Sequence, residues 1–182
     1  MSFIALAGLM LATRFHHFGS AISLPDASLI SFFFAGLLLK KLRFFVVLFI
    51  EAVLIDYIAI TQFSVSDFCI SNAYVALIPT YAAMWYAGYY CQRFKTLKMS
   101  ELSLRFGLLF AATSMAFLVS NGSFYLFSGR YPESSWAQYI ERVGMYYPPY
   151  LTSTLIYGIV VFAVIQIIKT LKAQADSQHH VV

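Results

Sequence analysis

Apolar residues follow one another along this chain in long blocks, which short polar stretches separate. The apolar blocks cover about residues 2–13, 27–39, 44–62, 69–90, 102–127 and 148–171. Open strand edges cannot be satisfied in lipid, so blocks of this length are expected to be helices. A spanning helix needs roughly 20 apolar residues, and the first two blocks reach that length only with their flanks. The pattern predicts an all-α integral membrane protein, a bundle of six transmembrane helices.

Composition supports a membrane protein. Of the 182 residues, 60% are hydrophobic and only 11% are charged, whereas soluble domains carry about 25% charged residues. The chain is therefore expected to form a single membrane domain, residues 1–182, without a sizeable soluble domain. No basic region precedes the first apolar block, so we expect no cleaved signal peptide. The net charge of +4 comes from residues beside apolar blocks, which favours a lipid bilayer and no nucleic acid as the partner.

The distribution of basic residues predicts the orientation. In a six-span arrangement Arg14, Arg130 and Arg142 fall on one side. The other nine basic residues fall on the opposite side: Lys40, Lys41, Arg43, Arg93, Lys95, Lys98, Arg105, Lys169 and Lys172. Cytoplasmic loops carry the excess of Lys and Arg. We therefore expect both termini in the cytoplasm.

The stretch 51–74 contains the most informative polar residues. Asp56 lies inside an apolar block, and Cys69 and Tyr74 follow a polar break at 64–67. A carboxylate in a bilayer costs roughly 2.5–3.5 kcal/mol on insertion scales, so Asp56 is expected to face a partner or a cavity. The orientation places it about 9 Å below the outer rim, where it could accept a hydrogen bond from Tyr74 or His17. This hairpin is expected to form part of an outward-facing ligand pocket.

Each candidate also has a simpler interpretation. Cysteines in apolar helices are usually small packing residues, and Cys91 keeps that interpretation; Cys69 differs because it adjoins the polar break. His16 and His17 could be an interfacial pair. Arg142 lies in a stretch that resembles an amphipathic surface helix, where most arginines are solvated. Glu51 lies about 140° around the helix from Asp56, so it is expected to serve packing instead.

Motifs of soluble enzymes are absent from the sequence. It has no Walker A motif, no G-x-S-x-G, no H-E-x-x-H and no Cys-x-x-Cys. The two cysteines also indicate no disulfide framework. These absences leave membrane transport or binding as the favoured class and an enzymatic activity as undecided.

Together, the six short spans, the polar outward loops and five dispersed residues resemble a known family. These residues are His17, Asp56, Cys69, Tyr74 and Arg142. The chain is similar to the substrate-binding components of energy-coupling factor vitamin transporters, and more narrowly to the BtuM-type cobalamin transporters, which are small solitary members of that class.

The resemblance implies a function and a role for each of these residues. It implies location in the bacterial inner membrane and uptake of cobalamin across it, with cobalamin as the transported substrate and Cys69 as an axial ligand of its cobalt. It also implies assistance in removing cyanide from cyanocobalamin, with Cys69, Asp56 and Tyr74 as the catalytic group. His17 and Arg142 would join those three in binding the corrinoid. The partner is either a shared energy-coupling module or none.

Two alternatives remain open at the level of sequence. A membrane haem or redox protein could use His16 or His17, but no second histidine lies within an apolar block, since His179 and His180 are in the tail. A small membrane assembly factor would need no ligand, and would leave Asp56 unexplained. Incubation of the purified protein with cobalamin or haem distinguishes these classes.

Overall fold

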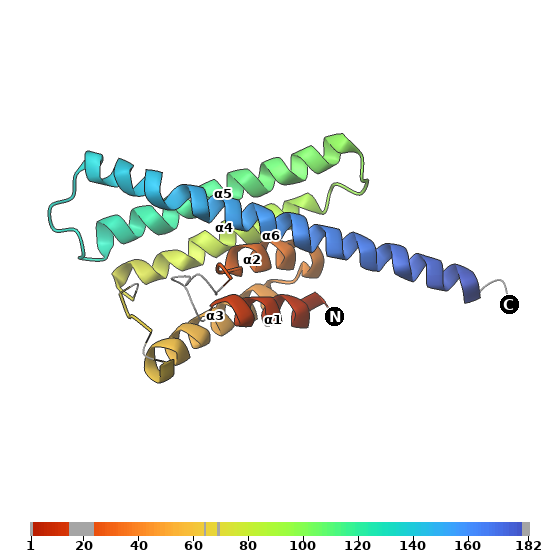
Figure 1. Ribbon diagram of the computed structural model, residues 1–182, viewed down its shortest axis with the longest axis horizontal. Coiled ribbons are helices and arrows are strands. Elements are labelled where there is room, and N and C mark those ends of the chain that lie inside the picture. Colours follow the sequence, from red (N-terminus) through yellow and green to blue (C-terminus); the bar gives the residue numbers. More distant parts are fainter. Residues whose placement is uncertain (1, 15–23, 64, 69, 180–182) are drawn as a thin grey trace.

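The regular elements of this chain are all helices in the computed structural model, which describes residues 2–14, 24–63, 65–68 and 70–179 (Figure 1). The elements are α1 (Ser2–Arg14), α2 (Ser28–Leu39), α3 (Leu42–Phe63), the 3-10 helix η1 (Asn72–Ala76), α4 (Leu77–Cys91), α5 (Met99–Phe127) and α6 (Trp136–His179). The expected all-α class is confirmed for this part of the chain.

Three helices are long and apolar enough to cross a membrane. They are α3, the 29-residue α5 and the part of α6 from Trp136 to Leu171, which has 36 residues. Helices α1 and α2 have 13 and 12 residues. At 1.5 Å per residue they are about 20 Å long, against a hydrocarbon core of about 30 Å. The structure therefore supports a helical membrane protein with three candidate spans.

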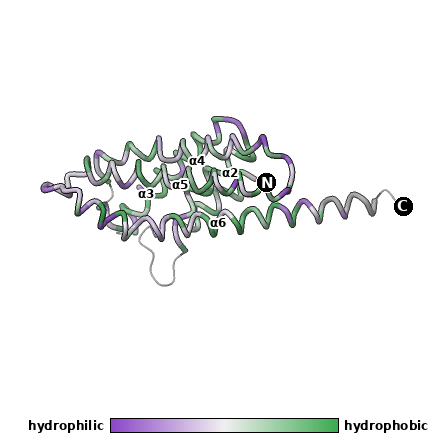
Figure 2. Tube along the Cα trace, turned by 90° about the horizontal axis from the view of Figure 1, so that it is seen from above, coloured by the Kyte–Doolittle hydropathy of each residue, from purple (hydrophilic) through white to green (hydrophobic). Residues whose placement is uncertain are grey.

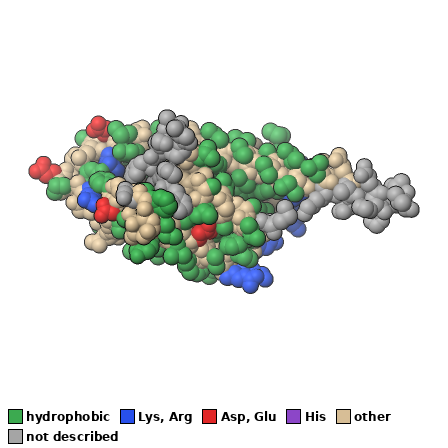
Figure 3. Space-filling view, turned by 60° about the horizontal axis from the view of Figure 1, so that its bottom comes forward, with side chains coloured by type: hydrophobic (Ala, Val, Ile, Leu, Met, Phe, Trp, Pro, Cys, Tyr) green, Lys and Arg blue, Asp and Glu red, His purple; other side chains and the backbone are tan. Residues whose placement is uncertain are grey.

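The surface has the character expected of a protein in lipid. Large apolar side chains point outward on the candidate spans, with Ile50, Leu118 and Ile159 each at least half exposed. On the face drawn in Figure 3, hydrophobic side chains cover most of the middle, while most charged side chains lie towards the two ends. A large exposed apolar surface is unfavourable for a monomer in water, but it is compatible with the hydrocarbon core of a membrane.

Helix α2 forms the centre of the bundle, and every residue from Ser28 to Gly36 is buried. It packs against α1, α3, α4 and α6, most extensively against α4. The crossing with α4 depends on two glycines. A Cβ on Gly36 would collide with the Trp85 carbonyl, and one on Gly88 would collide with the Phe33 carbonyl. Because the obstacles are backbone atoms, no side-chain movement would make room.

The start of α6 corrects one sequence expectation. The last apolar block was expected to begin at Pro148, after a stretch that resembles an amphipathic surface helix, but α6 is a single helix that begins at Trp136 and continues through Pro148 and Pro149. Ser135 explains the start, because its hydroxyl accepts a hydrogen bond from the Gln138 backbone N–H at 3.3 Å. A serine followed three residues later by glutamine is a helix-start signal.

The connections between helices separate to two ends of the bundle. The α3–α4 and α5–α6 connections lie at one end, while the α2–α3 and α4–α5 connections lie at the other (Figure 1). The C-terminal part of α6 extends beyond the remaining helices at this second end (Figure 2). The basic stretches 40–43 and 93–98 belong to the second pair of connections. The bundle thus has one strongly basic end.

Candidate functional site

The site is built around Arg14, the last residue of α1. A cation at this position is favoured by the carbonyl groups at the helix C-terminus. The side chain then turns into the protein, where Arg14 is only 2% exposed. A buried guanidinium needs partners for its N–H groups, and α2, α3 and α4 provide them.

Asp56 of α3 is the ionic partner of Arg14. The Nε and Nη2 groups of Arg14 donate to Asp56 Oδ1 and Oδ2 at 2.8 and 2.7 Å. Arg14 Nε also lies 3.3 Å from the Ala52 carbonyl oxygen, one helical turn before Asp56. Two parallel hydrogen bonds fix the orientation of a carboxylate as well as its charge. The pair therefore joins α1 to α3 in one geometry.

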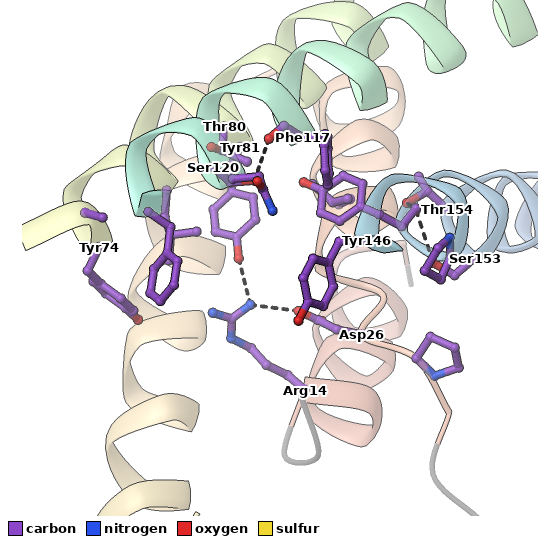
Figure 4. A pocket seen from close by; sticks show the side chains of 18 of the residues that line it. Arg14, Asp26, Tyr74, Thr80, Tyr81, Phe117, Ser120, Tyr146, Ser153 and Thr154 are labelled. Atoms are coloured by element: carbon purple, nitrogen blue, oxygen red, sulfur yellow. Dashed lines mark hydrogen bonds and ion pairs between the residues drawn. The ribbon is translucent and has the colours of Figure 1, made fainter. Parts of the chain in front are cut away.

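The Nη1 group of Arg14 binds the start of α2 and the helix α4. It donates to Asp26 Oδ2 at 3.1 Å, to the Ser28 hydroxyl at 2.8 Å and to the Tyr81 hydroxyl at 2.7 Å. Asp26 Oδ1 in turn accepts from the Ser28 backbone N–H and hydroxyl at 2.9 and 2.6 Å. Figure 4 shows Arg14 between Asp26 and Tyr81. Four helices thus meet at one side chain.

Tyr74 completes this group of contacts. Its hydroxyl donates to Asp56 Oδ2 at 2.6 Å, which confirms the expectation that Asp56 accepts a hydrogen bond from Tyr74. Tyr74 lies in η1, outside the three candidate spans, and Ser71 caps this short helix by accepting from the Ala73 N–H at 3.3 Å. Burial and the bond to Asp56 raise the pKa of the Tyr74 phenol. The phenol stays protonated and serves as a donor. We call Arg14, Asp26, Ser28, Asp56, Tyr74 and Tyr81 the Arg14 cluster.

A cavity of about 630 Å³ lies beside the Arg14 cluster. Five residues of the cluster line this cavity: Arg14, Asp26, Asp56, Tyr74 and Tyr81. The remaining wall comes mainly from α5 and α6, with aromatic residues such as Phe117 and Tyr146 facing the cluster (Figure 4). A largely apolar cavity of this size with a few convergent polar groups is typical of a small-molecule site. The lining residues come from the bundle end opposite the basic connections.

Arg142 lies on the α6 wall of this cavity, half-buried. Its guanidinium lies 4.6 and 5.0 Å from the ring centres of Tyr131 and Tyr146, and it donates to the Tyr131 hydroxyl. Stacking on two rings restricts an arginine more than solvation does. Arg142 is therefore a cavity residue, and the interpretation as a solvated surface arginine is wrong.

The structure brings together three of the five residues that the sequence singled out: Asp56, Tyr74 and Arg142. Cys69 and His17, and also His16, lie outside the described residues. Cys91 is buried at the other end of α4, away from Tyr74, and Glu51 does not line the cavity. Among the described residues, no group of three or more His, Cys, Asp or Glu side chains could hold a metal ion.

Sequence reasoning missed Arg14, Asp26 and Tyr81 as site residues. Arg14 was weighed only as an orientation signal, although a carboxylate within an apolar span requires a partner. Just three arginines were assigned to the same side as Asp56, and Arg14 was one of them. Pairing Asp56 with those arginines was the signal that could have revealed the ion pair. Tyr81 carried no such signal, since tyrosines are common throughout this chain.

Comparison of the chain with protein-family models gives no match, and comparison with curated proteins gives none either. The fold and the site define a class: a helical membrane protein with a largely apolar cavity and a few convergent polar groups near one end of its bundle.

Proposed function

We propose that this protein binds cobalamin at the cavity and carries it across the bacterial inner membrane. One observation supports this most strongly: Asp56, Tyr74 and Arg142, far apart in the sequence, line the same cavity of about 630 Å³. These are three of the five residues by which the sequence resembles BtuM-type cobalamin transporters. A bundle of membrane helices could fold without bringing these three residues to one cavity. Their convergence therefore favours a ligand site over an assembly factor that binds no ligand.

The orientation follows from the basic end of the bundle. Under the positive-inside rule the α2–α3 and α4–α5 connections, with residues 40–43 and 93–98, face the cytoplasm. The cavity would then open to the outside, as uptake requires. In this proposal α1, α2 and α4 join the three long helices to give six spans, with both termini in the cytoplasm.

Cys69 is the proposed cobalt ligand. Phe68 and Tyr74 both line the cavity, so the chain contributes to its wall on both sides of position 69. A thiolate is a soft, strongly donating ligand, and coordination to a metal favours its deprotonated form. Asp56, Tyr74, His17 and Arg142 would orient the thiolate and bind polar groups at the edge of the corrin ring.

The size of the cavity suits partial enclosure of the ligand. Sites of about 300–1,000 Å³ enclose drug-sized molecules, and a corrinoid is larger than those. We therefore propose that one face of the corrin ring enters the cavity while the opposite face remains towards the opening. A cyano ligand on that outer face lies opposite the Cys69 sulfur.

This arrangement would assist the removal of cyanide. The thiolate donates electron density to the cobalt and weakens the bond on the opposite face. An external reductant supplies the electron that converts cobalt(III) to cobalt(II), and cyanide leaves as the anion. Cys69, Asp56 and Tyr74 form the proposed catalytic group. The chain has no Walker A motif with which to hydrolyse ATP. In this proposal, the energy for uptake therefore comes from a shared energy-coupling module, or the protein transports cobalamin without such a module.

The direct test uses the detergent-purified full chain. After incubation with cyanocobalamin or with haem, gel filtration separates bound from free ligand, and absorption identifies what coelutes. We expect cobalamin to coelute and haem not to, and Glu51→Gln to retain cobalamin like the parent. Coelution of haem alone would replace the proposal by the redox class, and coelution of neither would favour the assembly factor.

A further inference from the structure

Asp56 already has its hydrogen-bonding capacity largely occupied. Its Oδ1 accepts from Arg14 Nε, while its Oδ2 accepts from both Arg14 Nη2 and the Tyr74 hydroxyl. The Asp56 side chain is only 7% exposed. A carboxylate held in this way reaches a ligand through its partners more readily than by direct contact. Tyr74, which is about half-buried and lines the cavity, is the partner nearest to Cys69 in the sequence.

Arg14 is itself fixed from the other side. Its Nη1 binds Asp26, Ser28 and Tyr81, and Tyr81 in turn stacks on Phe32, with ring centres 4.3 Å apart and planes within 5°. A guanidinium is planar, so holding one nitrogen fixes the direction of the others. The contacts with α2 and α4 therefore determine where the Arg14 fork meets Asp56.

We propose that Arg14 is a positioning residue of the ligand site. Its contacts with α2 and α4 hold the Arg14 side chain, which in turn orients the Asp56 carboxylate. The Asp56 carboxylate then orients the hydroxyl of Tyr74, which lines the cavity and follows Cys69 by five positions in the sequence. The inference rests on the proposed function for the identity of the ligand, cobalamin, but on the described contacts for the geometry.

Stability alone is a poor reason for such a cluster. Replacing a buried ion pair by apolar side chains of similar volume is often neutral or stabilising, because the charges no longer need to be desolvated. A pair retained for stability alone could thus be exchanged for methionine and leucine at little cost beyond the arginine contact that Asp26 would lose. A pair retained to orient Tyr74 could not, because the apolar exchange removes the acceptor of the Tyr74 hydroxyl.

The first experiment needs no ligand. Tyr74 is replaced by 3-fluorotyrosine in the full chain, and its fluorine resonance is compared between the parent and the double variant Arg14→Met/Asp56→Leu. We expect one narrow resonance in the parent, and a shifted, broadened or split resonance in the double variant, because the ring loses its anchor. The same chemical shift and line width in both proteins would overturn the proposal.

A second variant covers the case in which the double variant does not fold. Arg14→Lys keeps the positive charge but lacks the planar fork, so it cannot hold both oxygens of Asp56 in parallel. The fluorine resonance of residue 74 is expected to shift or broaden in this variant too. An unchanged resonance in a folded Arg14→Lys protein would contradict positioning by the guanidinium.

The second experiment measures cobalamin affinity in a double-mutant cycle. Tyr74→Phe is made in the parent and in the Arg14→Met/Asp56→Leu background. We expect about a tenfold rise in Kd in the parent, the effect of one lost hydrogen bond, and less than a twofold rise in the second background. Equal losses in both backgrounds would show that Arg14 and Tyr74 act independently. If the parent binds no cobalamin, the proposed function fails while the fluorine experiment still decides the positioning role.

Discussion

Arg14 at the end of α1 holds Asp56 in the middle of α3 through two hydrogen bonds of 2.8 and 2.7 Å. The two residues are 42 positions apart, and both side chains are almost fully buried. Their pairing explains how an apolar span tolerates a carboxylate. It also brings the short helix α1 into contact with the cavity, next to Asp26 and Tyr81.

The first prediction concerns the stability of this pair. Arg14→Met leaves Asp56 as a buried charge without its arginine, which costs about 3–5 kcal/mol of unfolding free energy. Arg14→Met/Asp56→Leu removes the Arg14–Asp56 pair and costs less, although Asp26, whose side chain is 27% exposed, still loses its arginine; we expect this variant to be clearly more stable than Arg14→Met. Denaturant unfolding in detergent measures both. A double variant as unstable as the single one would show that the charges themselves hold the bundle together.

The second prediction concerns the crossing of α2 and α4. Gly88→Ala places a Cβ against the Phe33 carbonyl, so the helices must move apart, at a cost of about 1–3 kcal/mol or more. Gly107→Ala is the matched control, because a Cβ at this exposed position of α5 meets nothing within 4 Å. It should be neutral or stabilising by up to about 1 kcal/mol. Thermal unfolding of both variants tests the close approach of α2 and α4. Equal melting temperatures for Gly88→Ala and Gly107→Ala would contradict it.

Sequence reasoning predicted the helical membrane class, six apolar helices and the placement of Asp56, Tyr74 and Arg142 at one cavity. Asp56 was the clearest signal because a carboxylate within an apolar block has few physical explanations. The partner of Asp56 was harder to find, since a separation of 42 positions carries no periodic pattern. The block at 2–13 is also too short to span a membrane without its flanks, so Arg14, which closes it, was used only to predict the orientation.

Helix boundaries were predicted less well than helix identities. The last span was predicted to start at Pro148, where the last apolar block begins. The Ser135 cap starts α6 earlier, and the helix accommodates both Pro148 and Pro149. Pro79 lies in the first turn of α4, where a proline is tolerated better than in a helix interior.

The third prediction concerns orientation in the membrane. Single cysteines are introduced at Glu133 and Thr96, both exposed, in a background with Cys69 and Cys91 replaced by alanine. An impermeant thiol reagent added outside intact cells should label position 133 and not position 96. The reverse pattern would turn the cavity towards the cytoplasm, where it could not receive a ligand for uptake.

The fourth prediction separates two acidic residues of α3 by function. Asp56→Asn should fold but bind cobalamin or release cyanide about tenfold less well, because a hydrogen bond to a charged group contributes about 1.5–3 kcal/mol. Glu51→Gln, away from the cavity, should show mainly a change in stability. Cyanide release under a fixed reductant and cobalamin affinity are measured for both. Parent-like values for Asp56→Asn would make Asp56 structural and remove it from the catalytic group.

The measurement that tests the account most directly is the absorption spectrum of cobalamin bound to the purified protein. Ligation by the Cys69 thiolate is expected to change the corrin bands relative to free cobalamin. Cys69→Ala should abolish that change, whereas Cys91→Ala, at the opposite end of α4 from Tyr74, should leave it intact. A spectrum from Cys69→Ala that still shows the parent's change would contradict a cysteine–cobalt bond at position 69.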